Sequence, residues 1–318
     1  MRVAYALAAQ ALPDYSSKFS RHDFTLPQLM ACLVVKEQMK RSYRGVEALL
    51  HDSMHWCRDI GMRRVPDHNT LQRAAAFLLR KYHANKLLDV TVQWAAVARM
   101  LKLSQKPLTM DSTYFESHHV SRYYERRRRS TAAQGGTKAK AAAKSHRRRT
   151  VSGLPKLAIS AAAACHVICS YWCGSGMGAD HPQFEPVLYD AWRRVPNRRF
   201  GVAADAGYDS HKNHQVARKD MGLASLIPPD IGRKPGKGVV LSSPYRQRMR
   251  RLLATRTSRR RCGYTQRWQS ETVNSMIKRN LGSALSGKSA ASRKRDMTLK
   301  VITHNVMVLP RRVETEHF

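Results

Sequence analysis

The sequence predicts an α/β domain preceded by an all-helical N-terminal domain. Apolar residues recur at three- and four-residue steps up to residue 104, and short β-prone segments then alternate with helical patterns. The final part of the chain returns to helical spacing. We therefore expect a helical domain over residues 1–104 and an α/β domain over residues 105–318.

The N-terminal domain is expected to be helical because its apolar side chains repeat with helical spacing. Leu29, Leu33 and Met39 form one such series. The segment 66–70, Pro-Asp-His-Asn-Thr, reads as a break followed by a polar cap for the next helix. A bundle of short helices follows from this pattern.

The second domain is expected to hold a sheet with helices packed on it. The order of its segments, strands first and then strands alternating with helices, is typical of such a fold. In chain order we expect a strand at 108–114, a strand or hairpin pair at 157–172, a helix at 180–192, a strand at 200–206, a helix capped by Ser210, a strand at 223–227 and a largely helical remainder at 245–309. The alanine run within 157–172 could equally form a helix.

An arginine-rich segment, residues 122–153, interrupts this domain between its first two expected strands. It contains the consecutive residues Arg126, Arg127, Arg128 and Arg129 and offers few side chains to bury. Like charges at this density favour a flexible arm outside the core. The arm could bind phosphates, or it could be a solvated insertion with no specific role.

Charge is the most unusual property of the composition. The 318 residues include 57 Lys and Arg against 22 Asp and Glu, which leaves a formal net charge of +35. Charge of this size indicates a polyanionic partner and says little about the fold. Neither a basic amphipathic helix nor a long apolar span is found, so we expect no membrane partner. Nucleic acid is the expected partner because basic residues recur along the whole chain.

The six cysteines indicate no metal or disulfide framework. Cys165, Cys169 and Cys173 follow at four-residue steps in an apolar, β-prone run, which suits buried small side chains better than zinc ligands. The apolar stretch after Met1 is short and is interrupted by Gln10, so we expect an N-terminal helix and not a signal peptide. These features predict a protein of the reducing cytoplasm.

Two aspartates stand at the ends of expected strands. Asp111 and Asp205 each follow a short apolar run, where a buried carboxylate needs compensation. Two such carboxylates could converge on one cation. Each could instead close its strand by an Asx-turn, as Asp does in many proteins that bind no metal. Asp209 competes for the second position, but its place directly before Ser210 favours helix capping.

A third acidic residue stands among two cations and a phenol. On a continuous helix, Tyr264, Arg267, Glu271 and Lys278 fall within about 60° of one another, and apolar residues fall on the opposite face. A carboxylate can complete a cation site, while Arg and Lys pair with phosphate oxygens. The alternative is an exposed helix face with an ordinary Arg267–Glu271 pair.

These motifs resemble the DDE triad and the Y-R-E-K signature of bacterial and archaeal insertion-sequence transposases of the fourth and fifth families. The residues that carry the resemblance are Asp111 in Met-Asp-Ser-Thr, Asp205 in Ala-Asp-Ala-Gly-Tyr-Asp-Ser, and Tyr264, Arg267, Glu271 and Lys278. The segments 43–45 and 65–71 are similar to the fifth family's N-terminal region, and no large β insertion separates Asp205 from Glu271. Both features place the chain closer to the fifth family.

The resemblance implies a ribonuclease-H-like mixed sheet with flanking helices. The first Asp would lie on the first strand, the second on the fourth and the Glu on a later helix. The implied endonuclease uses two Mg²⁺ ions, replaceable by Mn²⁺, about 3.5 to 4 Å apart and held by Asp111, Asp205 and Glu271. Arg267 and Lys278 would bind phosphates beside the scissile bond, and Tyr264 would position the backbone.

The implied reaction is cleavage at the ends of a mobile element, followed by attack of the freed 3′-hydroxyl on target DNA. Its partners would be terminal inverted repeats and target DNA, with residues 1–104 binding the ends and a homodimer bringing two ends together at the nucleoid. Two other classes stay open. One is a relative that only binds DNA, and the other is a metal-dependent nuclease without strand transfer.

Overall fold

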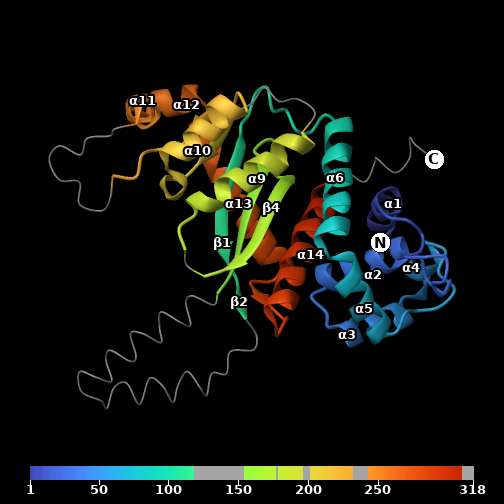
Figure 1. The fold of residues 1–318 in the computed structure, drawn as a ribbon. Helices are drawn as coiled ribbons and strands as arrows, with labels where there is room; N and C mark the ends of the chain where they lie inside the picture. The colour runs from blue at the N-terminus through green and yellow to red at the C-terminus, as the bar shows by residue number, and fades with distance from the viewer. Residues whose placement is uncertain (118–153, 177, 196–200, 232–242, 310–318) are drawn as a thin grey trace, which may run out of the picture.

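A bundle of helices joins a mixed β-sheet in the computed structural model (Figure 1). An all-helical N-terminal region followed by an α/β region is therefore confirmed. The predicted arm 122–153, with Arg126 to Arg129, lies outside the described residues. The structure describes residues 1–117, 154–176, 178–195, 201–231 and 243–309.

The N-terminal helices start where the sequence provides caps. The side chain of Thr25 accepts from the backbone of Gln28, whose Oε1 accepts from the backbone of Thr25 over 2.9 Å. Asp67 accepts from the backbone of Asn69 at 2.8 Å, which confirms the predicted polar cap. The helices are α1 (Arg2–Ala11), α2 (Leu26–Gln38), α3 (Tyr43–Asp52), α4 (Met54–Arg58), α5 (His68–Leu78) and α6 (Lys81–Val97).

The main sheet has the strand order β4-β3-β1-β5-β6. Its strands are β1 (Leu108–Tyr114), β3 (Pro155–Ala162), β4 (Ile168–Ser175), β5 (Gly201–Ala204) and β6 (Ala224–Leu226). The β1–β3 and β3–β4 pairs are antiparallel, whereas β1–β5 and β5–β6 are parallel. Of the alternatives for residues 157–172, the hairpin pair is the one that forms, as β3 and β4. A separate parallel pair joins β2 (Glu116–Ser117) to β7 (Ala284–Leu285).

Helices cover both faces of the main sheet. Alternate residues of a strand point to opposite faces, so Leu157 of β3 shares a buried cluster with Val273 while Ala158 shares another with Phe184. Val273 belongs to α13 (Trp268–Leu281), and Phe184 belongs to α9 (His181–Arg194). The site described below lies between these helices and the strand ends.

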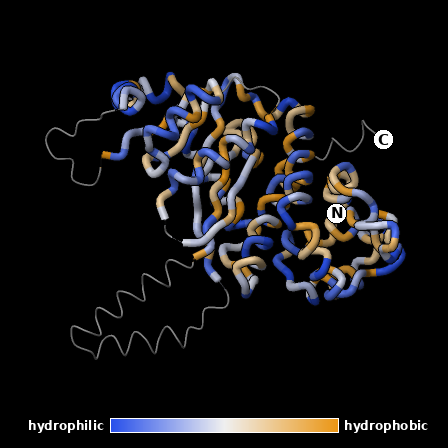
Figure 2. The backbone as a smooth tube through the Cα atoms, in the orientation of Figure 1, coloured by the Kyte–Doolittle hydropathy of each residue, from blue (hydrophilic) through white to orange (hydrophobic). Residues whose placement is uncertain are grey.

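The remaining elements follow β5. They are η1 (Ala206–Tyr208), α10 (His211–Gln215), η2 (Val216–Asp220), α11 (Pro244–Leu252), α12 (Arg256–Arg261), η3 (Tyr264–Arg267) and α14 (Ala290–Val308). In Figure 1, α11 and α12 lie together beside α10, far from the N-terminal bundle. Figure 2 colours most of these two helices as hydrophilic, whereas the N-terminal bundle and α14 carry many hydrophobic residues.

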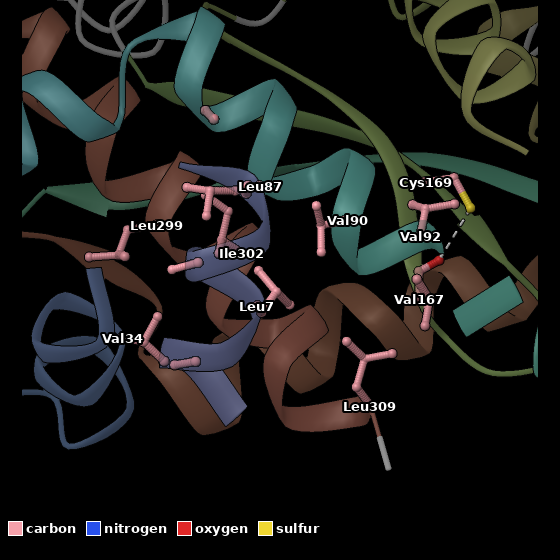
Figure 3. Close-up of a cluster of buried hydrophobic side chains, with 14 of the residues drawn as sticks. Leu7, Val34, Leu87, Val90, Val92, Val167, Cys169, Leu299, Ile302 and Leu309 are labelled. Carbon is pink, nitrogen blue, oxygen red and sulfur yellow. Dashed lines mark hydrogen bonds between the residues drawn. The ribbon is translucent and has the colours of Figure 1, made fainter. Parts of the chain in front are cut away.

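One hydrophobic core connects the N-terminal helices to the sheet. Figure 3 shows Leu7 of α1, Val92 of α6, Cys169 of β4 and Ile302 of α14 in a single cluster of buried side chains. A buried ion pair adds to this connection, because Nζ of Lys300 on α14 lies 2.7 Å from Oε1 of Glu37 at the end of α2. The domain boundary at residue 104 stays a prediction.

Candidate active site

Asp111 and Asp205 occupy equivalent places on two parallel neighbours. The pairing of β1 with β5 ends at Met110 and Ala204, and the two aspartates are the next residues. Both carboxylates therefore leave the strands at the same end of the pair. The prediction that Asp111 ends its strand was wrong, because β1 continues to Tyr114 through its antiparallel pairing with β3.

Burial and nearby negative charges make both aspartates weaker acids than usual. Burial raises the pKa of Asp111 to about 6, and the negative charge of Asp205 adds to this rise. Burial is also the largest cause that raises the pKa of Asp205, followed by the charge of Asp180. The strand ends therefore concentrate negative charge that the protein only partly neutralises.

Asp205 also forms the Asx-turn that was the alternative to a cation ligand at this position. Its Oδ1 accepts from the backbone nitrogen of Gly207 at 3.0 Å and starts the short 3-10 turn η1. This bond fixes the side chain without excluding a cation, because a carboxylate can accept at several lone pairs.

Asp180, directly before α9, adds a carboxylate that the sequence analysis did not select. Ser112 is the neighbour of Asp111, and its hydroxyl donates to Oδ1 of Asp180 over 2.6 Å. The Nζ of Lys156 lies 2.5 Å from the same oxygen. Lys156 is only 2% exposed and also donates to the carbonyl of Gly178 over 2.7 Å. Ser112 of β1 and the buried cation of Lys156 on the neighbouring strand β3 thus hold Asp180 close to Asp111.

The four residues of the Y-R-E-K pattern do not lie on one continuous α-helix, contrary to the prediction. Tyr264 and Arg267 form the 3-10 turn η3, and Glu271 and Lys278 follow on α13. Gly263 precedes the turn with φ of 78°, a left-handed conformation that favours glycine. Because a 3-10 turn has three residues per turn, Tyr264 and Arg267 still share one side.

Arg267 and Glu271 form an ion pair beside the aspartates. Nη2 of Arg267 lies 2.5 Å from Oε1 of Glu271, as the plainer interpretation of this spacing predicts. Burial lowers the pKa of Arg267, but its hydrogen bond to Glu271 and the negative charges around it together outweigh burial and raise the pKa. The positive charge of Arg267 lowers the pKa of Asp205, and the negative charge of Glu271 raises it. The side chain of Glu271 is 54% exposed, so the pair lies at the open side of the site.

Tyr264 and Lys278 take different places around this pair. Burial raises the pKa of Tyr264. The nearby charge of Arg267 lowers this pKa, and that of Asp205 raises it. Tyr264 therefore borders the site. Lys278 lies two turns beyond Glu271, with its Nζ 5.8 Å from the ring centroid of Phe115.

A family model described as a transposase DDE domain matches residues 102–306. This range is more than half of the chain and contains every site residue described above. The chain belongs to this transposase family. No curated protein and no solved structure matches the chain. The family ties the transposase to DNA as partner and to transposition and recombination as process.

Asn274 is a site residue of the transposase that the sequence analysis missed. Its Nδ2 donates to Oδ2 of Asp111 over 2.9 Å, and the residue is 6% exposed. Asn274 stands three residues after Glu271, on the helix side that meets the sheet. A polar residue beside the apolar positions Val273 and Ile277 was the available signal. Periodicity alone could not supply its partner.

Asp209 does not cap the helix, contrary to the prediction. Ser210 caps α10 by accepting from the backbone of Asn213 at 3.0 Å. Asp209 is instead buried and lies 2.7 Å from Nη2 of Arg246 on α11. Although burial raises its pKa, the hydrogen bonds from His214 and Arg246 lower it overall. Asp209 thus attaches the loop after Asp205 to α11.

Divalent cations suit the oxygen-rich donor set of the transposase. Oxygen ligands are those that Mg²⁺ and Mn²⁺ prefer, and Asp111 and Asp205 hold close negative charges. Oδ1 of Asn274 is also buried without a hydrogen-bond partner among the described residues. Yet no three His, Cys, Asp or Glu side chains in those residues are grouped closely enough to bind a metal ion. Glu271 is engaged with Arg267 instead.

No helix within the described parts of the transposase has the length and apolar character that crossing a bilayer requires.

Proposed function

We propose that this transposase cleaves DNA at the ends of its element and joins the freed 3′ ends to target DNA by transesterification. Asp111, Asp205 and Glu271 are the proposed catalytic residues and ligands of two Mg²⁺ or Mn²⁺ ions. The observation that carries this proposal is the placement of Asp111 and Asp205 side by side at the end of the β1–β5 pair. Two carboxylates from adjacent strands are a natural way to bind one cation.

Glu271 is proposed to join the two aspartates by exchanging its partner. Its carboxylate now pairs with Arg267, and its charge already acts on Asp205. When Glu271 turns to a cation, the guanidinium of Arg267 is released for a phosphate oxygen, which it can bind through two parallel hydrogen bonds. One movement would thus prepare both the cation site and the phosphate site.

The bound cations would lower the pKa of a water molecule and stabilise the leaving oxygen. The chain's own residues do the remaining work. Asn274 orients Asp111, Arg267 neutralises charge on the phosphate, and Tyr264 positions the backbone. Lys278 is proposed to bind, like Arg267, a phosphate beside the scissile bond. The predicted role of Arg126 to Arg129 in phosphate binding also stays a proposal.

The remaining family assignments are proposals as well. The first Asp lies on the first strand of the main sheet, the second follows the fourth strand in chain order, and Glu271 lies on a later helix. This order supports a ribonuclease-H-like fold. We also propose that the chain belongs to the fifth insertion-sequence family and that residues 1–104 bind the DNA ends. The transposase would act as a dimer in the DNA complex, at the nucleoid in the cytoplasm.

The decisive experiment measures cleavage and joining of terminal inverted repeats in the presence of Mg²⁺. Asp111→Ala, Asp205→Ala and Glu271→Ala should each abolish cleavage, and Asp220→Ala removes an exposed carboxylate elsewhere as the matched control. Undiminished cleavage by any of the first three variants would overturn the assignment. Cleavage without joined products would identify a nuclease, and binding without cleavage by the unaltered chain would identify a DNA binder.

A further inference from the structure

The segment between Asp205 and Glu271 contains a concentration of positive charge that lies almost entirely outside the Y-R-E-K pattern. Residues 243–270 include nine arginines and no Asp, Glu or Lys. Besides Arg259, which donates to the carbonyl of Leu253, six of these arginines are exposed on α11 and α12, namely Arg248, Arg250, Arg251, Arg256, Arg260 and Arg261. We call these six side chains the arginine surface.

Two apolar residues hold the arginine surface in place. Met249 of α11 is fully buried in a cluster with Ala203 of β5 and Leu226 of β6. Leu253 is 3% exposed, and its carbonyl accepts from Nε of Arg259 over 2.6 Å. Because Met249 points toward the sheet, the arginines around it on α11 point toward solvent.

The charge of the arginine surface is not neutralised by the protein. None of the six side chains forms an ion pair with any residue that the structure describes, whereas Arg246 pairs with Asp209. Burial and the charge of Arg248 together lower the pKa of Arg218 on η2, a sign of repulsion between cations. The positive charge of the arginine surface can therefore attract a negatively charged partner.

Helix α12 retains this charge at a cost to its own stability. Arg256 and Arg260 stand four residues apart, a spacing at which like charges repel on a helix. No residue of α12 is buried, so packing of its own side chains does not compensate. Its cap is the side chain of Thr255, which accepts from the backbone of Ser258 at 3.2 Å. A helix of this kind gains stability when a polyanion approaches.

The arginine surface is continuous with the proposed active site. The short connection after α12 leads through Gly263 directly into η3, and Tyr264 packs on the same cluster as Met249. The positive charge of Arg259 lowers the pKa of Tyr264, and the negative charge of Asp205 raises it. Trp268, at the start of α13, is 53% exposed. A chain of cationic and aromatic side chains thus extends from α11 to the proposed catalytic carboxylates.

We infer that the arginine surface binds the phosphate backbone of double-stranded DNA and guides the duplex into the active site. For the identity of the nucleic acid, this inference rests on the proposed function. Arginines spread over two short helices, without an acidic residue among them, suit contacts to successive phosphates rather than readout of bases. The binding should therefore be independent of sequence and strongly dependent on salt.

Metal-free binding of a fluorescent duplex by the full chain tests this inference. The variant Arg250→Gln/Arg251→Gln/Arg260→Gln should bind at least about tenfold more weakly at about 0.1 M salt. A plot of log affinity against log salt concentration should become less steep, with the magnitude of its negative slope smaller by about 2.7, because each of the three lost phosphate contacts contributes about 0.9 to that magnitude. The loss should be equal for duplexes of unrelated sequence.

A matched control removes three exposed cations elsewhere, through Lys219→Gln/Lys288→Gln/Lys294→Gln. This control should keep its affinity within about twofold. Both variants should melt at a temperature no lower than that of the unaltered chain, since all six positions are exposed. A second triple, Arg248→Gln/Arg256→Gln/Arg261→Gln, repeats the test with different side chains.

Unchanged affinity and salt slope in both arginine triples would overturn the inference and leave this surface to another partner, such as an acidic protein. An equal loss in the lysine control would also overturn it, because the effect would then belong to the net charge alone. The assay needs neither metal nor cleavage and leaves Asp111, Asp205 and Glu271 intact. Failure of the proposed chemistry can thus be told apart from failure of this surface.

Discussion

Asn274 and Asp111 stand 163 residues apart in the chain and meet through a hydrogen bond of 2.9 Å. The amide of Asn274 can donate but carries no charge, so it orients the carboxylate without neutralising it. This contact joins the central strand β1 to α13, which also carries Glu271. This hydrogen bond therefore helps to set the relative positions of two proposed metal ligands.

Replacing Asn274 by Ala should slow DNA cleavage by about ten- to a hundredfold, because a hydrogen bond to a charged group contributes about 1.5 to 3 kcal/mol. The pKa of Asp111 should rise further, since this bond lowers it in the folded chain. The pH–rate profile should shift upward accordingly. Ser275→Ala, at the next position of α13, is the control. Equal rates for the two variants would argue against an orienting role.

The stability of the metal-free protein should respond to pH through Asp111. Its folded pKa of about 6 lies above the unfolded value of 3.8. The group therefore contributes stability below about pH 4, and this contribution is lost as the pH rises through 6. Asp111→Asn should be more stable than the unaltered chain at pH 8, by up to about 3 kcal/mol, and should lose that advantage near pH 4. Urea unfolding at the two pH values measures the difference, and a pH-independent difference would contradict it.

Divalent cations should raise the melting temperature of the DNA-free protein by relieving repulsion between Asp111 and Asp205. A ligand that binds only the folded chain at a hundredfold excess over its Kd stabilises it by about 2.7 kcal/mol. Mg²⁺ and Mn²⁺ should act on the unaltered chain and on Asp220→Ala, and a chelator should reverse the shift. An undiminished shift in Asp111→Ala and Asp205→Ala would place the ions elsewhere.

Removal of Asp180 should destabilise the fold through its buried partner. Asp180→Ala leaves the ammonium of Lys156 unpaired in a site that is 2% exposed, which costs about 3 to 5 kcal/mol. Adding Lys156→Met should restore most of this loss, because it removes the unpaired charge. Equilibrium unfolding of the single and double variants tests the coupling. Purely additive effects would show that the two side chains do not depend on each other.

The sequence predicted the elements of the fold better than their contacts. Helical spacing located the N-terminal helices, and β-prone runs located all five strands of the main sheet. Asp111 and Asp205 were selected because a carboxylate after an apolar run is chemically unusual. Their adjacency depends on the parallel pairing of β1 with β5, which no local pattern specifies.

The residues that were missed owe their roles to distant partners. Asn274 reads as one polar position on a helix, and Lys156 reads as a charge beside a strand, until the fold brings Asp111 and Asp180 to them. The α-helical wheel was wrong at Tyr264 because Gly263 and the 3-10 turn interrupt the helix. Spacing indicates which side chains share a face, but it does not indicate what that face meets.

The hairpin of β1 and β3 holds the two ends of residues 118–153 together. Tyr114 is paired with Lys156, and the backbone nitrogen of Phe115 donates to the carbonyl of Pro155 over 2.9 Å. The entropy of closing a loop between fixed ends grows only with the logarithm of its length, about 0.6 kcal/mol for each doubling. Changes in the number of residues between Phe115 and Pro155 should therefore cost little in folding free energy. For the same reason, an engineer could insert a foreign domain there.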